Sequence, residues 1–579
     1  MARRIPLSAR LFPQARKALR RFRTDLSAWT TPGGTPNSFH AAKVEGFAGV
    51  PADGADILEG EWHRFGQSLE VEPSALWTTP LPSLRFASWL HCFEWLDGVA
   101  ALDNAAARVR ARQLVDGWVE EYGQYHSFAW EPDRVARRLY SWMLHWSPVL
   151  NTDNLSDLAA GRRASALKQG RFLRRNLSRL PKGIPEIRAL VALSMLGARW
   201  PRGDGMLAFA QSRLSEALGQ QILPDGGHVS RSPEAALSVL RWLKALDALL
   251  DARGVAVDPS VTRATDRLAP MAAFFSHTDG GLAAFHGSGE GETDRIATLL
   301  EGLPSKPFAF APHSHYQRLD REGTTVIIDV GGPPPFPFDG EAHLSPLAFE
   351  MSVPEGRLIT ACGWSSEQPA QWRQPVRMTA AHSALEMPEH KAGRFLDPDT
   401  IATSLRRPVI ARGGDPVSAD RREAEPGIIV QGSHHAYVPA TGLVHSRRLF
   451  LASDGGDLRG EDRLAPPPGA VTPFKDPIEV VIRFHLYPGV KAGLAKDKRH
   501  VWLKPDMEGA PWVFLFSGGD ADLSLALESS AYLGKGVRPQ PTEQIVVRGR
   551  AVPGENFLVR WALRRKRPVG SADEGDSDA

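Results

Sequence analysis

The spacing of apolar residues changes once along this chain of 579 residues, and that change constrains the fold more than any other feature. Up to about Leu300, apolar residues recur every three or four positions, which is typical of amphipathic helices. From about Phe308 onward they alternate or form short runs between turn signals, as in β-strands. We therefore expect a helical part followed by a β part.

Six segments of the first part carry the helical spacing, and some begin with recognisable start signals. Pro132 stands near the start of one segment, and Pro233 follows a capping serine in another. The expected helices are Asn104–Tyr122, Glu131–Trp146, Ala164–Leu180, Ile184–Leu196, Met206–Ile222 and Pro233–Ala252.

Strand-like segments in the second part are short and numerous, and Gly- and Pro-rich turns separate them. This pattern favours one large antiparallel sandwich. The expected strands are Gly323–Val330, Leu347–Val353, Arg357–Ala361, Gly427–Gln431, Ser446–Ala452, Ile478–Tyr487, His500–Lys504, Trp512–Ser517 and Glu543–Val547. The expected organisation is a basic segment at 1–40, a helical domain at 41–305, a β-sandwich at 306–565 and an acidic disordered tail at 566–579.

Composition and charge argue against several classes of protein. A formal net charge of +3 on 579 residues gives no overall attraction for nucleic acid. Cys92 and Cys362 lie in different expected domains, so we expect neither a disulfide framework nor a cysteine metal site. The basic N-terminal segment lacks the apolar core of a signal peptide, and no run reaches the roughly 20 apolar residues that span a bilayer. By itself the sequence predicts a cytoplasmic protein without a transmembrane segment.

Two polar stretches, one in each part, are the candidates for chemistry. Asp225–Pro233 reads DGGHVSRSP, in which His228 can exchange protons near neutral pH and Arg231 can grip a carboxylate or sulfate. Asp339–Glu350 reads DGEAHLSPLAFE and places His343 at the start of an alternating strand. Either stretch can equally be a plain loop, as a helix cap in the first case and a turn in the second.

Tryptophan is concentrated in the helical part. Indole rings stack well on sugar rings, but tryptophan at helical spacing also fills the core between helices, and both interpretations stay open here. The residues are Trp89, Trp95, Trp118, Trp130, Trp142 and Trp146. Phosphate loops, GxSxG elbows and HExxH motifs are absent from the sequence.

Several pieces of sequence, in their order along the chain, resemble the heparinase II/III-like polysaccharide lyases. They are Gln221–Pro233, His277–Gly287, Gly340–Ser352, Arg357–Gly363, Arg377–Leu385, Gly432–Leu451 and Gly460–Asp462. The resemblance implies an incomplete α/α toroid packed on an antiparallel β-sandwich, with a cleft at their junction. It also implies cleavage of a uronate-containing polysaccharide by β-elimination, and a periplasmic or envelope location.

The resemblance also implies roles for single residues. His343 matches the sandwich histidine that serves in acid/base work, and His382 matches a histidine that binds zinc in some members. Zinc held by His382 together with His343 is the cofactor that the resemblance allows. The family's Asn-His pair falls on Pro181 and Lys182, where lysine can still neutralise a carboxylate.

The sequence departs from the family pattern at two further positions. The family tyrosine after the Ser-Pro pair falls near Ala235, which has no proton to give. The zinc-binding aspartate falls near Ala361, which puts a complete metal site in doubt.

β-Elimination defines the groups that such a site needs. A cationic or donor group neutralises the uronate carboxylate, a base removes the neighbouring proton, and an acid protonates the leaving oxygen. His343 and His228 are the expected acid/base pair. The expected substrate contacts are Arg231, Lys182, Arg188 and Asp225.

Two other functions stay open. Loss of the family tyrosine predicts, as an alternative, a catalytically degenerate protein that binds glycans on the same fold. Glycoside hydrolysis would need two carboxylates across the cleft, for which Asp225 and Glu341 are the candidates. The expected partner is an acidic polysaccharide.

Overall fold

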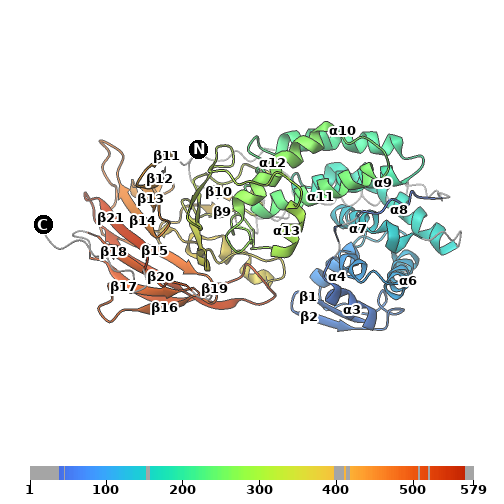
Figure 1. Cartoon of the computed structure of the whole chain (residues 1–579), viewed down its shortest axis with the longest axis horizontal. Coiled ribbons are helices and arrows are strands. Elements are labelled where there is room, and N and C mark those ends of the chain that lie inside the picture. Colours follow the sequence, from blue (N-terminus) through green and yellow to red (C-terminus); the bar gives the residue numbers. More distant parts are fainter. Residues whose placement is uncertain are drawn as a thin grey trace.

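The computed structural model describes residues 38–44, 46–47, 49–151, 157–396, 410–412, 418–505, 509–518 and 522–566. A helical part occupies one end of the molecule and a β part the other (Figure 1). The expected basic segment and acidic tail lie outside the described residues, apart from 38–40 and Lys566. Among the described residues, none of the helices is long and apolar enough to cross a membrane.

The helical part is an incomplete α/α toroid, and each of the six expected segments contains a helix. Its helices are α3 (Pro51–Glu59), α4 (Leu84–Cys92), α5 (Leu96–Ala101), α6 (Ala105–Tyr122), α7 (Pro132–Leu144), α8 (Asp157–Asn176), α9 (Ile184–Arg199), α10 (Asp204–Gln221), α11 (Pro233–Asp251), α12 (Pro259–Phe275) and α13 (Thr293–Leu300). A hairpin of β1 (Glu61–Arg64) and β2 (Gln67–Glu70) interrupts the part that we expected to be helical throughout.

The toroid has a continuous apolar core to which all six tryptophans belong. Each of them is at most 6% exposed, so the core interpretation of the tryptophan cluster is confirmed. Val109, which helical spacing places on the apolar face, is instead 46% exposed, because α6 buries its Ala107, Ala111 and Leu114.

The β part is an antiparallel sandwich, as the strand pattern predicts. Among the described residues, one sheet has the order β19-β20-β15-β7-β6-β5-β4-β3, with β8 also pairing with β15, and the other has the order β11-β12-β13-β14-β21-β18-β17-β16. Bounds in the first sheet are β3 (Phe310–Ala311), β4 (Tyr316–Arg321), β5 (Thr324–Asp329), β6 (Phe349–Val353), β7 (Gly356–Thr360), β8 (Leu385–Glu386), β15 (Ile478–Leu486), β19 (Ser524–Tyr532) and β20 (Gln540–Ala551). Bounds in the second are β11 (Ser418–Ala424), β12 (Gly427–His434), β13 (Val444–Ala452), β14 (Asp457–Ala465), β16 (Lys491–Leu494), β17 (His500–Lys504), β18 (Trp512–Ser517) and β21 (Phe557–Arg565). A short pair, β9 (Arg394–Phe395) and β10 (Ile410–Arg412), lies outside both sheets.

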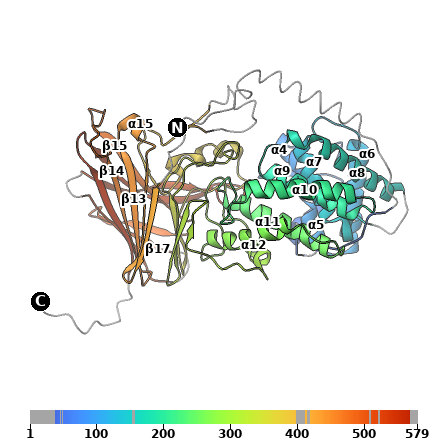
Figure 2. The same ribbon diagram turned by 90° about the horizontal axis from the view of Figure 1, so that it is seen from above.

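The two parts share a core of their own. Phe274 and Phe275 at the end of α12 pack in one apolar cluster with Tyr316 of β4 and Ile327 of β5. In both ribbon views α12 lies between the other helices and the sandwich (Figures 1 and 2). The junction is therefore a packed interface and not a flexible linker.

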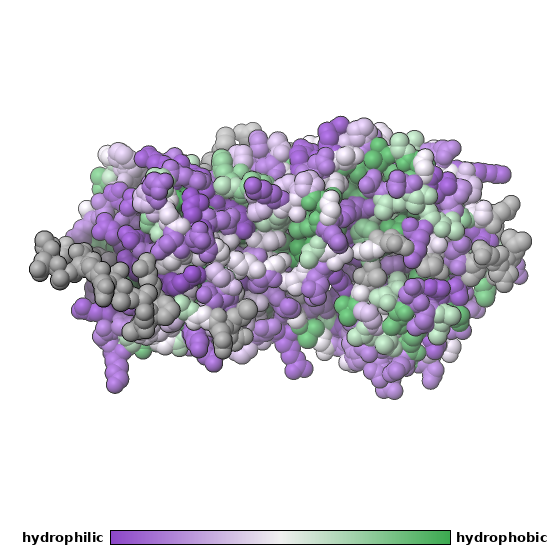
Figure 3. All heavy atoms as spheres, viewed as in Figure 1, coloured by the Kyte–Doolittle hydropathy of each residue, from purple (hydrophilic) through white to green (hydrophobic). Residues whose placement is uncertain are grey.

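On the face shown in Figure 3, apolar surface gathers over the helical part, while the sandwich is largely hydrophilic.

A buried carboxylate, Asp462 of β14, holds the arginine that links the two sheets. It accepts two hydrogen bonds from Arg447, at 2.8 and 3.0 Å, and one each from His445 at 2.8 Å and Trp561 at 2.9 Å. Arg447 also donates to the carbonyl oxygen of Leu347 beside the other sheet, at 2.9 Å. Because all these groups are buried, each charge depends on its partner.

We expect Asp462→Ala to lower the free energy of unfolding by about 3–5 kcal/mol, because it leaves the Arg447 guanidinium buried and unpaired. Urea denaturation followed by circular dichroism measures the loss. Arg463→Ala, on the exposed face of the same strand, is the matched control and should change stability little. A loss for Asp462→Ala no larger than that of the control would contradict the assignment.

Candidate functional site

The polar stretch predicted in the helical part forms the turn between α10 and α11. Gly226 in this turn has φ +90°, and a Cβ there would lie 2.0 Å from the carbonyl oxygen of Arg267. The Gly226 N–H donates to Leu223 O at 2.9 Å and closes the turn. Only glycine fits that conformation and that approach, so Gly226 fixes the path by which Arg231 reaches the sandwich.

Arg231 is 5% exposed, and groups of the β part surround its guanidinium. It forms an ion pair with Asp329 at the end of β5. It also donates to the backbone oxygens of Ser314 (2.8 Å), Gly332 (2.6 Å) and His315 (3.2 Å). The carboxylate that Arg231 grips is therefore internal, and Arg231 fastens the toroid turn to the sandwich.

His286 connects this ion pair to the predicted sandwich histidine. Its Nδ1 accepts from the His343 N–H at 3.0 Å, so its proton is assigned to Nε2, which donates to Asp329 at 3.1 Å. Burial alone would raise the pKa of Asp329, but Arg231 and His286 outweigh burial and hold this pKa below its ordinary value. Asp329 is therefore an ionised centre on the sandwich with two partners, Arg231 and His286, from loops of the helical part.

His343 is 4% exposed, and backbone amides of the neighbouring loop face its ring. Nε2 lies 2.8 Å from the Gly287 nitrogen and Nδ1 lies 3.1 Å from the His286 nitrogen. Burial, and then the nearby His382, His286 and Arg377, hold the pKa of His343 well below its ordinary value. The ring is thus neutral, and because a neutral imidazole has one acceptor nitrogen, it accepts a hydrogen bond from one of these two amides at a time.

The zinc site allowed by the resemblance does not fit the residues present. His382 lies beside His343, with ring centroids 4.6 Å apart, but its Nε2 donates to the Val376 carbonyl oxygen at 3.1 Å. Its Nδ1 has no hydrogen-bond partner in the described part of the chain. Zinc in proteins takes at least three protein donors, and among the described residues no three His, Cys, Asp or Glu side chains are grouped for a metal.

His228 belongs to a second chain of polar side chains. Its Nδ1 lies 2.7 Å from Ser230 Oγ, and its Nε2 lies 3.4 Å from Gln221 Oε1. Gln221 donates to Glu186 at 2.9 Å, and Glu186 pairs with Lys182, whose side chain is 50% exposed. Burial lowers the pKa of His228 to about 4, so this ring is neutral at pH 7. The two imidazoles predicted as an acid/base pair thus belong to separate groups.

Asp225 also serves the junction. Its carboxylate accepts from the N–H groups of His313 and Ser314, at 2.8 and 2.7 Å, and from the Ser314 hydroxyl at 2.8 Å. Asp225 therefore braces a turn of the sandwich against the toroid.

Glu341, the second acid considered for hydrolysis, forms an ion pair with Arg373.

Arg188 lies elsewhere, at a cavity of about 320 Å³ inside the toroid. It donates to Asp133 at 2.8 Å, and its Cζ lies 5.3 Å from the centre of the Trp242 ring. The cavity is rich in paired charges and indole rings. Its lining includes Trp89, Trp95, Trp242, Arg64, Arg137, Arg188, Arg241, Arg295, Glu94 and Asp97.

Sequence reasoning missed the two residues that organise the junction, Asp329 and His286. Each had a signal in the sequence: Asp329 is the last but one residue of the apolar run GTTVIIDV, which two glycines follow, and His286 is the last but one residue of the Gly-rich passage HTDGGLAAFHG. A buried carboxylate on a strand needs a cation or hydrogen-bond donor as its partner, and for Asp329 that partner is Arg231.

The fold and the junction can now be compared with known proteins. The family model described as "Heparinase II/III-like, C-terminal" matches residues 303–569. FtsZ-localized protein C of Caulobacter vibrioides is 32% identical over 528 residues, which cover 89% of this chain and 88% of that protein. A crystal structure of heparinase III matches with a TM-score of 0.65 at 12% identity, covering 97% of this chain and 93% of that one. A heparan sulfate lyase HepC mutant from Pedobacter heparinus matches with a TM-score of 0.60 at 15% identity, covering 96% and 90%.

A helical toroid followed by a β-sandwich is the fold that this chain shares with heparinase III and with HepC. The chain belongs to the heparinase II/III-like family. The structural likenesses, at identities of 12% and 15%, establish the fold.

We expect Arg231→Met to lower the free energy of unfolding by about 3–5 kcal/mol, because it leaves Asp329 buried and without its main cation. Urea denaturation measures this. Arg188→Met, at the toroid cavity, is the matched control and should cost less, since Arg188 sits at a cavity and not in the junction. Unchanged stability of Arg231→Met would instead return Arg231 to the list of ligand contacts.

His228 makes folding stability depend on pH. Its pKa of about 4 in the folded protein lies below the ordinary 6.5, so the unfolded chain binds this proton more readily. The resulting stability is complete above about pH 6.5 and is lost as the pH falls towards 4. Between about pH 7 and pH 5 it amounts to about 2 kcal/mol.

His228→Gln should therefore lose less stability between pH 7 and pH 5 than the unmodified chain, by about 2 kcal/mol. Parallel urea titrations at the two pH values give the difference. His63→Gln, which alters a half-exposed histidine, is the control. Equal losses for the unmodified chain and His228→Gln would show that His228 is not buried in neutral form.

Proposed function

We propose that this chain is a catalytically degenerate member of the heparinase II/III-like family that works as a binding protein localised with FtsZ. The observation that carries the proposal is that Arg231 and His343 both contact groups of this same chain. Arg231 is paired with Asp329, and backbone amides face both ring nitrogens of His343. The name of the Caulobacter vibrioides relative, FtsZ-localized protein C, supports the second half of the proposal.

The chemistry of β-elimination explains why internal use argues against catalysis. The base must reach a proton of the sugar, and the carboxylate must meet a free cation or donor. The buried imidazole of His343 has backbone amides at both nitrogens, so it cannot reach a sugar proton without rearrangement. Arg231 is already paired with Asp329, so it cannot meet the sugar carboxylate as a free cation. Ala235 at the family tyrosine position lies in the first turn of α11, where its N–H donates to Ser232 Oγ at 3.3 Å and its methyl group offers no proton.

Localisation with FtsZ also bears on the compartment. It agrees with the cytoplasmic location that we expected from the sequence. The periplasmic or envelope location implied by the resemblance finds no support in the comparisons and is not part of the proposal.

A second candidate function, binding or cleavage of an acidic polysaccharide, is favoured by the toroid cavity. Indole rings and guanidinium groups line it together, a combination that suits anionic sugars. Most of its arginines are already paired, however: Arg241 lies 2.6 Å from Asp97, and Arg137 forms two bonds of 2.7 Å with Glu94. A sugar carboxylate that approached either of these arginines would compete with its partner.

Two assays separate the functions. Purified full-length chain should sediment together with FtsZ polymers. It should give no rise in ultraviolet absorbance, the signature of the unsaturated product, with heparin, heparan sulfate, alginate or bacterial exopolysaccharides. Arg188→Ala serves as a control, because it alters the toroid cavity and should leave sedimentation with FtsZ unchanged.

Opposite results would overturn the proposal. A rise in absorbance that disappears in His343→Ala would make the chain a lyase with His343 in its mechanism. Binding of a polysaccharide without absorbance, and without sedimentation with FtsZ, would make it the glycan-binding protein considered from the sequence. New reducing ends without absorbance would indicate hydrolysis.

A further inference from the structure

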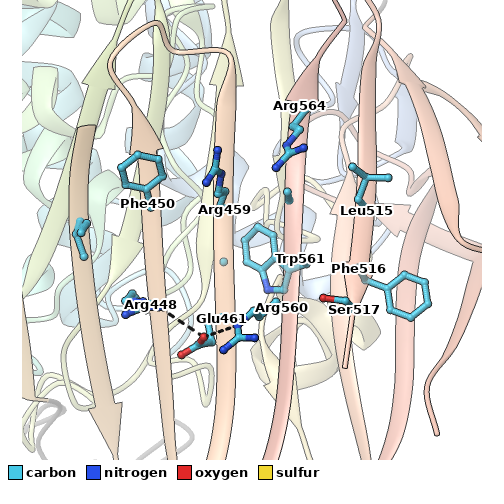
Figure 4. A pocket seen from close by; sticks show the side chains of 13 residues that line it. Arg448, Phe450, Arg459, Glu461, Leu515, Phe516, Ser517, Arg560, Trp561 and Arg564 are labelled. Atoms are coloured by element: carbon cyan, nitrogen blue, oxygen red, sulfur yellow. Dashed lines mark hydrogen bonds and ion pairs between the residues drawn. The ribbon is translucent and has the colours of Figure 1, made fainter. Parts of the chain in front are cut away.

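The outer face of the eight-stranded sheet carries a basic, partly apolar hollow that the mechanism of a lyase does not use. It lies across β13, β14, β21 and β18, which are neighbours in the sheet, and has a volume of about 640 Å³ (Figure 4). We propose that this hollow, the arginine groove, binds an extended acidic peptide that carries one aromatic or branched aliphatic side chain. The inference goes beyond the proposed function and does not rest on it.

The floor of the groove is a row of side chains perpendicular to the strands, in which Phe450, Ala562 and Leu515 are apolar and Arg459 is charged. Strand register places Phe450 opposite Arg459, Arg459 opposite Ala562, and Ala562 opposite Leu515. Ala562 has only a methyl group, so the floor dips between Phe450 and Leu515. These two lie three strand spacings apart, or about 14 Å. A large apolar side chain can therefore settle over Ala562.

Four arginines surround this floor: Arg448, Arg459, Arg560 and Arg564. Their side chains are between 48% and 65% exposed, whereas the two carboxylates among them, Asp457 and Glu461, are 17% and 22% exposed. Glu461 lies 3.5 Å from Arg448 and 2.9 Å from Arg560, and Asp457 lies 2.7 Å from Arg459 and 3.3 Å from Arg564. Each carboxylate thus serves two guanidinium groups, and two positive charges stay uncompensated.

This arrangement fits an incoming carboxylate. Surface ion pairs contribute little free energy, so a guanidinium can keep its own partner and accept a second acceptor with its remaining N–H groups. Figure 4 shows Arg448 and Arg560 on either side of Glu461, with their ends open on the outer face. Acidic side chains alternating along an extended peptide can reach successive arginines of this rim.

The mixture of charges favours a peptide over a sulfated polysaccharide. Asp457 and Glu461 interrupt the row of cations and would repel a chain that carries an anion on every sugar. The apolar floor would also stay exposed to water under such a chain, because a polysaccharide brings no large apolar side chain. A peptide can place one apolar residue over Ala562 and leave gaps opposite the two carboxylates.

The sheet holds the groove rigidly from below. Trp561, next to Ala562, lies against Gly460, where a Cβ would come within 2.1 Å of the indole. Its Nε1 donates to the buried Asp462 at 2.9 Å, and its ring stacks on Phe349 with centroids 5.4 Å apart. The floor therefore needs little reorganisation on binding, which favours affinity.

The experiment is fluorescence anisotropy with the full-length chain and a fluorescein-labelled synthetic peptide in which four aspartates flank a central phenylalanine. We expect saturable binding that weakens with added salt. Arg448→Glu combined with Arg560→Glu should weaken it at least about tenfold, since like charges would then face the peptide. Ala562→Trp should also weaken binding, because the indole fills the dip in the floor.

Matched controls separate groove binding from general charge effects. Arg422→Glu alters an arginine whose side chain is 80% exposed on β11 of the same sheet, outside the groove, and should leave the affinity unchanged. Replacing the peptide's phenylalanine with alanine should reduce affinity as Ala562→Trp does. Thermal unfolding of each variant confirms that the sandwich is intact.

Four results would overturn the proposal. The first is that the unmodified chain shows no saturable binding of the peptide. The second is that Arg422→Glu lowers the affinity as much as the groove variants do. The third is that a heparin oligosaccharide competes with the peptide and binds more tightly. The fourth tests the chain's own acidic C-terminal segment as the occupant. If the peptide binds only after Asp573, Glu574, Asp576 and Asp578 are changed to their amides in the full chain, that segment fills the groove and no partner is needed.

Discussion

The buried ion pair between Arg231 and Asp329 is the interaction on which the rest of the structure depends. One partner comes from the turn between α10 and α11, and the other ends β5, so the pair crosses from toroid to sandwich. A charge buried at such a place is tolerable only when a partner of opposite sign meets it. Asp225, His286 and His343 then arrange themselves around this pair through hydrogen bonds to the loops on either side. Together with the apolar cluster around Phe274 and Phe275, it determines how the two parts pack.

The residues of the lyase-like sequence pattern lie at this junction, where they contact one another. Histidine, arginine and aspartate are the groups that catalysis uses, but buried in a junction they satisfy each other and the backbone. A sequence motif records which residue types are present. It does not record whether a cleft opens in front of them, and here the imidazole of His343 faces Gly287 and His286. Arg231 and His343 thus have their contacts within the chain in this structure.

The architecture could be predicted because local spacing determines much of it. The runs His500–Lys504 and Trp512–Ser517 are strands β17 and β18 with the same bounds, since each is short, apolar and bounded by turn residues. Strands such as β14 (Asp457–Ala465) and β21 (Phe557–Arg565) escaped prediction because arginine and aspartate interrupt their alternation. Those charged residues find partners of opposite charge only when the sheet forms. Asp462 then pairs with Arg447, and Arg560 pairs with Glu461, across neighbouring strands.

By itself, the sequence determined that a helical part precedes an antiparallel β part, and it marked the two polar stretches that meet at their junction. It could do so because periodicity, turn residues and helix caps act over a few neighbouring positions. Only the tertiary structure decided that Arg231 grips Asp329, that His228 and His343 belong to separate groups, and that four arginines of three strands surround one hollow. Contacts between residues tens or hundreds of positions apart depend on how the two parts pack, and no local pattern records that.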